Sequence, residues 1–283
     1  MENILEVSNL NKAYSRFSLN NLSFSLPEGC ITGLIGVNGA GKTTTIKTLL
    51  GLSTKDAGSV RFFGMNMDTH ASQIKQRLGI VFDDGCFYED LSLIEMKNII
   101  APAYKNWSDK DFNAYMKRFA LPKDQKIHSL SKGMRMKYAL ALALSHKAEL
   151  LIMDEPTSGL DPLIRSQLLN ILQDFMAKGG KGVFFSTHIT SDLDKIADML
   201  IMIDHGQIIL QEDKDTLLDT YRIVKAGLKT LSPSVRPLLI NITENSYGFT
   251  AITKEAAAVR KMVPDALLER PSIEDIMLCH ISH

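Results

Sequence analysis

The sequence contains few cysteines, and neither sign of charge dominates it. The three cysteines, Cys30, Cys86 and Cys279, are odd in number and widely spaced. Their spacing supports neither a disulfide framework nor a cysteine-based metal site, which indicates a reduced compartment. Lys and Arg number 32, and Asp and Glu also number 32. Because a strongly basic composition is absent, we expect no nucleic acid among the partners.

Long apolar segments are also absent. The longest apolar runs, such as residues 138–144 and 199–203, fall well short of the roughly 18 residues that a membrane-spanning helix needs. Residues 1–10 carry two acids and no extended apolar segment, so we expect no signal peptide. If the protein works at a membrane, we expect a different chain to cross it.

What is present is typical of a globular α/β protein. Hydrophobic residues make up 45% and charged residues 23% of the 283 residues, which are globular averages. At about 150 residues per domain, this length favours two domains. Short apolar runs at residues 31–35, 78–82, 150–153 and 182–186 alternate with helix-like runs. This alternation predicts a mainly parallel sheet that helices cover on both faces.

Two stretches depart from this alternation. Residues 86–146 show helical periodicity, and Pro102 and Pro122 mark breaks within it, so we expect an all-helical insert there. Residues 216–283 mix strand-like and helix-like runs. We therefore expect a main domain over residues 1–215 and a small α+β C-terminal accessory extension over residues 216–283.

A phosphate-binding loop is expected after the apolar run at residues 31–35. The segment fits the pattern G-x-x-x-x-G-K-[ST] and consists of Gly36, Val37, Asn38, Gly39, Ala40, Gly41, Lys42 and Thr43. Glycines let the backbone N–H groups point at phosphate oxygens, and the following helix adds its positive dipole end. Lys42 would reach the β- and γ-phosphates, and the Thr43 hydroxyl would bind Mg²⁺. The alternative is a glycine-rich turn with an exposed lysine.

A pair of acids follows the apolar run at residues 150–153. Asp154 and Glu155 stand at its carboxyl end, the edge where open α/β sheets place their ligands. Asp154 is the candidate for holding Mg²⁺, and Glu155 is placed to polarise an attacking water as a general base. The alternative is a surface acidic pair in a turn that includes Pro156.

Further motifs resemble those of ATP-binding cassette (ABC) proteins. Leu130-Ser131-Lys132-Gly133-Met134 is similar to the family's signature, Leu-Ser-Gly-Gly-Gln. Ser158-Gly159-Leu160-Asp161 resembles its D-loop, and His188 stands where the family has a switch histidine after a strand. Tyr14 lies in the region of the family's adenine-stacking aromatic, a role for which Phe17 competes. The resemblance covers roughly residues 1–215, and the order of these motifs is more specific than any one of them.

Simpler interpretations exist for two of these residues. His188 taken alone would be a strand-end or core histidine. Ser131 taken alone would be an ordinary N-cap of a helix, with Gly133 in its first turn. The order of the motifs favours the functional interpretation of both.

The resemblance implies a P-loop ATPase that hydrolyses ATP with Mg²⁺ between two cassettes. Its fold would have a mainly parallel core sheet, an antiparallel amino-terminal part, the helical insert and the α+β extension. The catalytic residues would be Lys42, Glu155 and His188, and the metal would be held by Thr43, Asp154 and Asp83. Nucleotide contacts would come from Tyr14, the loop from Gly36 to Thr43, Thr44 and, across the dimer, Ser131, Gly133 and Asp161. Because one chain carries one P-loop, the second cassette would be another copy or a relative.

The resemblance also implies a partner and a location. The helical insert would receive a short helix of an integral membrane permease in a groove near Asp83. The chain would then be cytoplasmic and peripheral on the inner face of the cell membrane. The short insert and the C-terminal extension resemble bacterial ABC-2 type drug, bacteriocin or peptide exporter ATPases, so we expect export.

Two departures from the family pattern stand out. Asp83 occupies a position that is usually glutamine, and Asp84 is the alternative in register. Aspartate is shorter, accepts hydrogen bonds only and adds charge, so it would bind Mg²⁺ tightly or through water alone. Lys132 replaces a glycine of the signature, and Met134 replaces its glutamine. Lys132 either adds charge near the partner's nucleotide or is solvated at the helix start.

Two other functions are alternatives. A soluble ABC-type ATPase acting on nucleic acid or ribosomes would carry long coiled coils or two cassettes, whereas this sequence has no sustained heptads and one P-loop. A weakly hydrolysing regulatory cassette is the other alternative, because of Asp83 and Lys132. A GTPase is not expected, since no Asn-Lys-x-Asp motif occurs.

Overall fold

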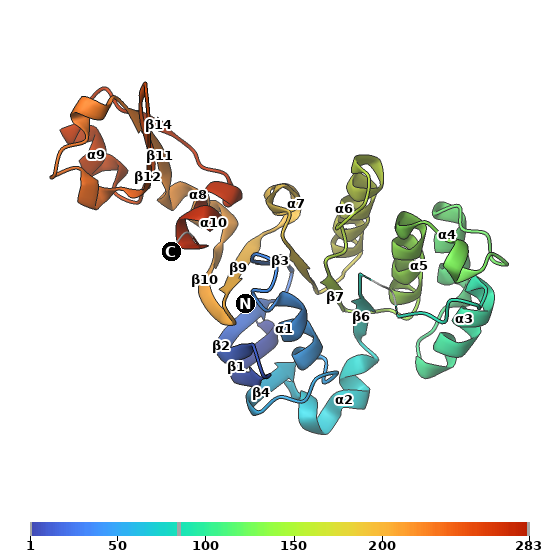
Figure 1. The fold of residues 1–283 in the computed structure, drawn as a ribbon. Helices are drawn as coiled ribbons and strands as arrows, with labels where there is room; N and C mark the ends of the chain where they lie inside the picture. Colours follow the sequence, from blue (N-terminus) through green and yellow to red (C-terminus); the bar gives the residue numbers. More distant parts are fainter. Residues whose placement is uncertain (1, 84–85, 282–283) are drawn as a thin grey trace.

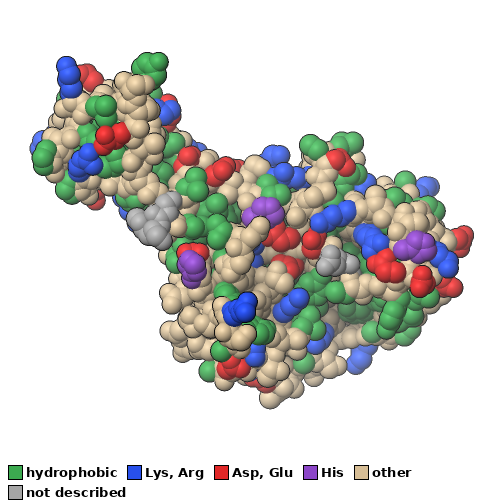
Figure 2. Space-filling model, viewed as in Figure 1, with side chains coloured by type: hydrophobic (Ala, Val, Ile, Leu, Met, Phe, Trp, Pro, Cys, Tyr) green, Lys and Arg blue, Asp and Glu red, His purple; other side chains and the backbone are tan. Residues whose placement is uncertain are grey.

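The computed structural model describes residues 2–83 and 86–281, so Asp84 lies outside the described residues. Three sheets form the framework of the molecule (Figure 1). One sheet is antiparallel and amino-terminal, the second is the central sheet, and the third belongs to a carboxyl-terminal lobe that projects from the rest, as Figure 2 also shows. Among the described residues, no helix combines the length and the apolarity that a membrane crossing would require.

The amino-terminal sheet has the strand order β2-β1-β4-β5. Its strands are β1 (Asn3–Ala13), β2 (Ser18–Pro27), β4 (Ala57–Phe62) and β5 (Met65–Asn66). In β2, the alternate residues Leu22, Phe24 and Leu26 are buried, because successive side chains of a strand point to opposite faces. The antiparallel amino-terminal part is therefore present.

The central sheet has six strands in the order β10-β9-β3-β8-β7-β6. They are β3 (Cys30–Ile35), β6 (Leu78–Val81), β7 (Leu150–Asp154), β8 (Gly182–Thr187), β9 (Met199–Asp204) and β10 (Gln207–Asp213). Strands β9, β3, β8, β7 and β6 pair in parallel, and β10 pairs antiparallel with β9. This is the mainly parallel sheet that the sequence predicts.

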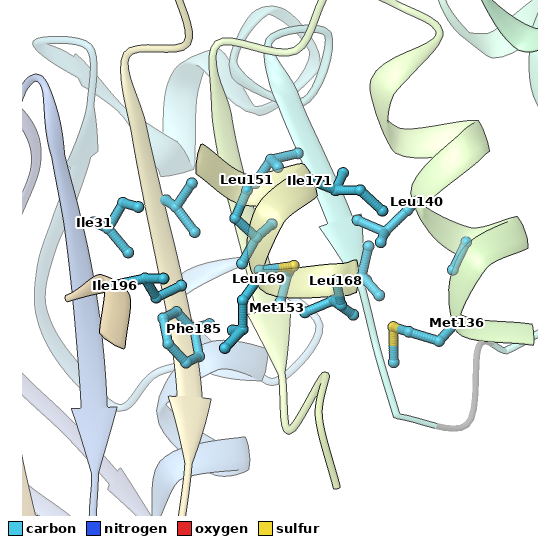
Figure 3. Packing of buried hydrophobic residues seen from close by; sticks show 14 of the residues in the cluster. Ile31, Met136, Leu140, Leu151, Met153, Leu168, Leu169, Ile171, Phe185 and Ile196 are labelled. Atoms are coloured by element: carbon cyan, nitrogen blue, oxygen red, sulfur yellow. The ribbon is translucent and has the colours of Figure 1, made fainter. Parts of the chain in front are cut away.

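Alternate residues of the central strands pack into two different cores. Leu151 and Met153 of β7 lie in one cluster with Phe185 of β8, and Leu150 and Ile152 lie in the other. Figure 3 shows part of the first cluster, in which Leu151, Met153 and Phe185 meet helical residues. Full burial of each such side chain contributes about 1.5–3 kcal/mol. Strands β3, β7 and β8 are buried on both faces, which explains their near-continuous apolar sequences.

Helices cover both faces of the central sheet (Figure 1). Helices α1 (Lys42–Leu49) and α2 (Met67–Lys75) contribute to the core shared with the amino-terminal sheet. Helices α6 (Pro162–Ala177) and α7 (Thr190–Ile196) contribute to the opposite core.

The insert is helical, as expected. It contains α3 (Leu93–Ile100), α4 (Asp109–Arg118) and α5 (Lys132–Leu144), with the short 3₁₀ segments η1 (Ala101–Ala103) and η2 (Ile127–Ser129). Serines cap the three helices, and Ser92 and Glu95 form a reciprocal capping box at the start of α3. The same serines therefore signal the helix starts in the sequence.

The carboxyl-terminal lobe has a four-stranded antiparallel sheet in the order β12-β13-β11-β14. The elements from residue 214 onward are α8 (Lys214–Thr220), β11 (Arg222–Ala226), η3 (Leu228–Thr230), η4 (Arg236–Leu238), β12 (Ile240–Asn245), β13 (Gly248–Thr253), α9 (Ala256–Met262), β14 (Leu267–Glu269) and α10 (Ile273–Ile281). Val224, Phe249 and Val259 belong to a separate small core.

The last helix returns to the main body. Helix α10 contacts α7, and its Ile273 and Ile276 share a buried cluster with Leu193 and Ile196 of α7. The sequence predicts the α+β character of the extension but gives no sign of this return, because long-range packing leaves no periodic signal.

Candidate functional site

Two of the three glycines in the loop between β3 and α1, Gly36 and Gly41, lie where the surroundings leave no room for a side chain. A Cβ added to Gly36 would lie 2.4 Å from the carbonyl oxygen of Ile203. Gly41 has a φ of 115°, and a Cβ there would lie 2.7 Å from Cζ of Phe17. Both positions therefore require glycine for close packing, and Gly41 also requires it for its left-handed backbone.

This loop ends at the positive end of a helix. Gly41 is the N-cap of α1, and among the described residues no side chain caps the first turn. The first N–H groups and the helix dipole therefore favour an anion at this point. The geometry is that of the phosphate-binding loop expected from the sequence.

Lys42 links the loop to the acids at the end of β7. Its side chain is 6% exposed, and its Nζ donates to the carbonyl oxygens of Gly36 at 2.7 Å and Val37 at 3.3 Å. The same Nζ lies 3.2 Å from Oε1 of Glu155. A buried ammonium is thus satisfied by carbonyl dipoles and one carboxylate, all of which a phosphate can replace.

Glu155 lies between Lys42 and His188. Its other oxygen, Oε2, lies 2.8 Å from Nδ1 of His188, which comes from the segment after β8. Glu155 is a non-glycine residue with a φ of 49°, a sparsely populated conformation that clusters at functional sites. The sharp turn after β7 aims this carboxylate at the loop.

Asp154 lies beneath this group and is held in place by Ser186. Asp154 is 5% exposed, and its Oδ1 accepts a hydrogen bond from Oγ of Ser186 at 2.6 Å. Oγ of Ser186 in turn accepts from the backbone N–H of Glu155 at 3.0 Å. Ser186 therefore orients both acids. This role of Ser186 was not predicted, because a serine inside an apolar strand carries no spacing signal.

A cavity of about 740 Å³ opens at this point, a size that fits a nucleotide. Its lining consists of Tyr14, Arg16, Phe17, Asn38, Gly39, Gly41, Lys42, Thr43, Thr44, Glu155, Ser158 and His188. The structure thus brings most of the expected site residues together around one hollow. Arg16 and Ser158 are additional members. Arg16 was detectable as a cation beside Tyr14, and Ser158 as the first residue of the D-loop-like segment.

Both aromatic candidates for a nucleotide base lie at this cavity. Tyr14 is 49% exposed, its hydroxyl lies 2.6 Å from Oγ of Ser53, and Lys12 Nζ lies 5.2 Å from its ring. Phe17 is partly buried and packs toward Gly41. Tyr14 has the free ring surface that stacking on a base requires.

Three expected nucleotide contacts lie elsewhere. Among the described residues that line the cavity, none is Ser131, Gly133 or Asp161. Ser131 caps α5 by accepting from the N–H of Met134 at 3.3 Å, and a Cβ on Gly133 would lie 3.2 Å from Cγ2 of Ile164. Asp161 caps α6 by accepting from the N–H groups of Leu163 and Ile164, each at 3.0 Å. Each residue therefore has a local structural role within this chain.

Asp83 and Lys132, two of the residues that depart from the family pattern, contact each other. Oδ1 of Asp83 lies 2.6 Å from Nζ of Lys132. This ammonium lies off the hydrogen-bond direction of that buried oxygen, so the contact is an ion pair without a well-formed hydrogen bond. Within the described part of the chain, neither residue lines the cavity.

Thr43 and Asp154 fit a magnesium ion that binds together with a nucleotide. The described residues contain no cluster of three or more His, Cys, Asp or Glu side chains that would hold a metal ion by themselves. The Thr43 hydroxyl at the cavity and the buried Asp154 carboxylate are hard oxygen donors. Mg²⁺ prefers such donors together with phosphate oxygens and water.

The fold and this site define a P-loop nucleotide hydrolase with a helical insert. The family model described as ABC transporter matches residues 19–158. The chain is 30% identical over 263 residues to the bacitracin transport ATP-binding protein BcrA of Enterococcus faecalis, a match that covers 92% of this chain and 84% of the relative. It is 34% identical over 250 residues to the Nod factor export ATP-binding protein I of Ralstonia nicotianae, covering 85% of this chain and 77% of the relative.

A solved ATP-binding subunit of an ABC transporter has the same fold, with a TM-score of 0.69 and 28% identity. That match covers 76% of this chain and 92% of the other. The chain therefore belongs to the ABC transporter ATP-binding family, as the motifs of the sequence indicate. It is an ATP-binding, ATP-hydrolysing transporter subunit, and its likeness to exporter subunits agrees with the resemblance to ABC-2 type ATPases.

Proposed function

We propose that this chain drives export through a separate integral membrane permease, on whose cytoplasmic side it is bound. The observation that carries the ATP-hydrolysing part of this proposal is the placement of Glu155 between Lys42 and His188 at the phosphate-binding loop. The named relatives support the direction, since one is a bacitracin transport subunit and the other a Nod factor export subunit. We further propose that residues 1–215 form the cassette and residues 216–283 an accessory extension.

The contacts of Lys42 suggest how ATP prepares the site. In the structure, Glu155 and the loop carbonyls satisfy Lys42. When β- and γ-phosphate oxygens take over the ammonium, Glu155 is released to accept a proton from the attacking water. His188, already hydrogen-bonded to Glu155, would hold that carboxylate and contact the γ-phosphate. Positioning and charge stabilisation then supply most of the catalysis.

Magnesium would be held by Thr43 and Asp154. The ion would neutralise charge on the β- and γ-phosphates. Ser186 holds Asp154 by a hydrogen bond to one oxygen, which leaves the other oxygen for the ion or for a water bound to it. Tyr14 would stack on the base, and the N–H groups of the loop and Thr44 would bind the phosphates.

A second cassette would complete each site. Ser131 and Gly133 start a helix whose first N–H groups favour an anion, yet within the described residues they do not line this chain's own cavity. We propose that they contact the γ-phosphate held by another cassette, with Asp161 beside them, and that a second copy of this chain fills that role. Two-fold symmetry would then form two equal sites.

The permease would dock beside the helical insert. A mainly apolar cavity of about 290 Å³ lies between the end of β6 and helices α3 and α5, and Phe82, Phe87, Met96 and Ala139 are among its lining residues. An amphipathic helix can place its apolar face in such a groove. Ile80 and Val81 of β6, the strand that precedes Asp83, also line this cavity. Movement of the permease would therefore be linked to the nucleotide site through β6.

The test is recovery of the partner with a variant that binds ATP without hydrolysing it. Tagged Glu155→Gln, extracted from host membranes with mild detergent and ATP, is expected to bring down a multi-span membrane protein in stoichiometric amount. Glu155→Gln combined with Lys42→Ala serves as the control, because it lacks the phosphate contact. Recovery in the soluble fraction alone, with ribosomes or DNA, would overturn the proposal in favour of a soluble ATPase.

A further inference from the structure

Two of the three positions that depart from the family pattern, Asp83 and Lys132, are joined by an ion pair across two parts of the fold. Asp83 stands just beyond β6 of the central sheet, and Lys132 is the first residue of α5 in the helical insert. Their charged atoms lie 2.6 Å apart, and the side chains are 36% and 40% exposed respectively. The contact thus connects the nucleotide-binding core to the start of the signature helix.

Lys132 also lies against a third segment. A Cβ added to Gly159 would lie 3.4 Å from both Nζ and Cδ of Lys132. Gly159 belongs to the turn between Glu155 and α6, and its φ of 67° favours glycine. One lysine side chain of the signature helix therefore pairs with the residue beyond β6 and also lies beside the D-loop-like segment.

The ion pair argues against two roles considered earlier, Asp83 as a Mg²⁺ ligand and Lys132 as a contact of the partner's nucleotide. A carboxylate engaged by an ammonium at 2.6 Å is less available as a metal ligand, and the same ammonium is less available to a phosphate. Together the two charges cancel, so Asp83 adds no net negative charge beside the acids Asp154 and Glu155. Either residue without the other would leave a partly buried charge without its partner.

We propose that Asp83 and Lys132 are a matched pair of positioning residues that fix the start of α5 against the nucleotide-binding core. Because Ser131 caps this helix and Gly133 lies in its first turn, the pair sets where the signature is presented to the other cassette. This proposal adds positioning residues to the composite site proposed above. Only its turnover measurement depends on that site being correct.

The test compares single neutral substitutions with a charge exchange. Asp83→Asn and Lys132→Met each lower kcat for ATP about two- to fivefold, the scale of a partly exposed ion pair. The KM for ATP and the Mg²⁺ concentration for half-maximal turnover stay unchanged, because within the described residues neither side chain lines the cavity. The double variant Asp83→Lys with Lys132→Asp restores most of the lost kcat.

A matched pair elsewhere in the chain provides the control. Lys225 and Glu269 also lie 2.6 Å apart, with side chains 46% and 39% exposed, in the carboxyl-terminal sheet. Lys225→Met and Glu269→Gln remove an ion pair of the same length and similar exposure, which is also hydrogen-bonded, far along the chain from the signature. Both are expected to leave kcat unchanged.

A second measurement reports on position without using activity. Spin labels at Lys47→Cys in α1 and Lys110→Cys in α4, with Cys30 and Cys86 replaced by Ser, give the distance between core and insert. The single variants are expected to broaden this distance distribution, and the charge exchange to narrow it again. Full turnover in Glu155→Gln would refute the proposed catalytic site. The distance measurement would still test the ion pair in that case, because it does not depend on activity.

Three results would overturn the pair. A higher Mg²⁺ requirement in Asp83→Asn, with none in Lys132→Met, would make Asp83 a metal ligand. A higher KM for ATP in Lys132→Met, with none in Asp83→Asn, would make Lys132 a nucleotide contact. If the charge-exchange variant keeps the lowered kcat and the broad spin-label distance distribution of the single variants, the two charges do not act on each other.

Discussion

At the scale of single residues, Glu155 is the centre of the site. Its two oxygens contact Lys42 at 3.2 Å and His188 at 2.8 Å, and its backbone N–H is bound by Ser186. The carboxylate is held from two sides and its backbone from a third, so it needs little reorganisation when a nucleotide replaces the Lys42 contact. This preorganisation is what a general base requires.

Replacing Glu155 by Gln tests that role. The amide keeps the size of the side chain but is not a base, so ATP binding is retained while turnover falls roughly 10²- to 10⁴-fold. Steady-state ATP hydrolysis and equilibrium nucleotide binding measure the two effects. Glu255→Gln, at an exposed residue before α9, is the control. Turnover in Glu155→Gln equal to that of the control would refute the assignment.

His146 offers a test of burial at the end of the insert. Its side chain is 1% exposed and stacks on Tyr104, with ring centroids 3.8 Å apart and planes 12° apart. Burial lowers the pKa of His146 from 6.5 to about 4. Below pH 6.5 the unfolded chain gains a proton at this residue that the folded chain does not bind, so stability falls as the pH falls.

The expected loss is about 3 kcal/mol between pH 6.5 and pH 4, at about 1.4 kcal/mol for each unit of pKa difference. Denaturant unfolding at a series of pH values measures it. His146→Phe keeps a stacked ring without a titrating group, so its stability should decline less over this range than that of the unaltered protein. Parallel pH curves for the two proteins would contradict the account.

At the scale of elements, the sequence predicts what depends on neighbours in the chain. The loop at Lys42, the acids after β7 and the serine-capped helices of the insert are all encoded in short segments. The ion pair between Asp83 and Lys132 was not predicted, because each residue was judged by its own motif. The return of α10 onto α7 was not predicted either, because two distant amphipathic segments do not reveal which surface each covers.

The contact between α10 and α7 yields a prediction about stability. Ile276 is fully buried in the cluster that includes Leu193 of α7. Ile276→Ala removes methyl and methylene groups and leaves a cavity, so the free energy of unfolding falls by about 2–5 kcal/mol. Leu278→Ala, on the same helix where the side chain is 49% exposed, is the matched control.

Chemical unfolding of the two variants measures the difference. The expected change for Leu278→Ala is under about 1 kcal/mol, as for a surface position. Because α7 follows directly after His188, the Ile276→Ala variant also reports whether the extension supports the site. Equal stability of the two variants would show that α10 does not pack on the main body in solution.

At the scale of the whole molecule, the two halves of the proposed composite site lie apart within one chain. The cavity gathers Lys42, Thr43, Glu155 and His188. Ser131 and Gly133 start a helix of the insert, and among the described residues they do not line that cavity. Both halves were identifiable in the sequence as local motifs. Their separation within one chain is a property of the fold, and it makes a second cassette part of the proposed mechanism.

The most direct measurement is ATP turnover per chain as a function of chain concentration, with the molecular mass determined by sedimentation in the same samples. If each site needs two cassettes, turnover per chain rises with concentration as dimers form, and Ser131→Arg abolishes both the rise and the ATP-dependent dimer. A chain that remains a monomer and hydrolyses ATP at the same rate per molecule at every concentration would contradict the account.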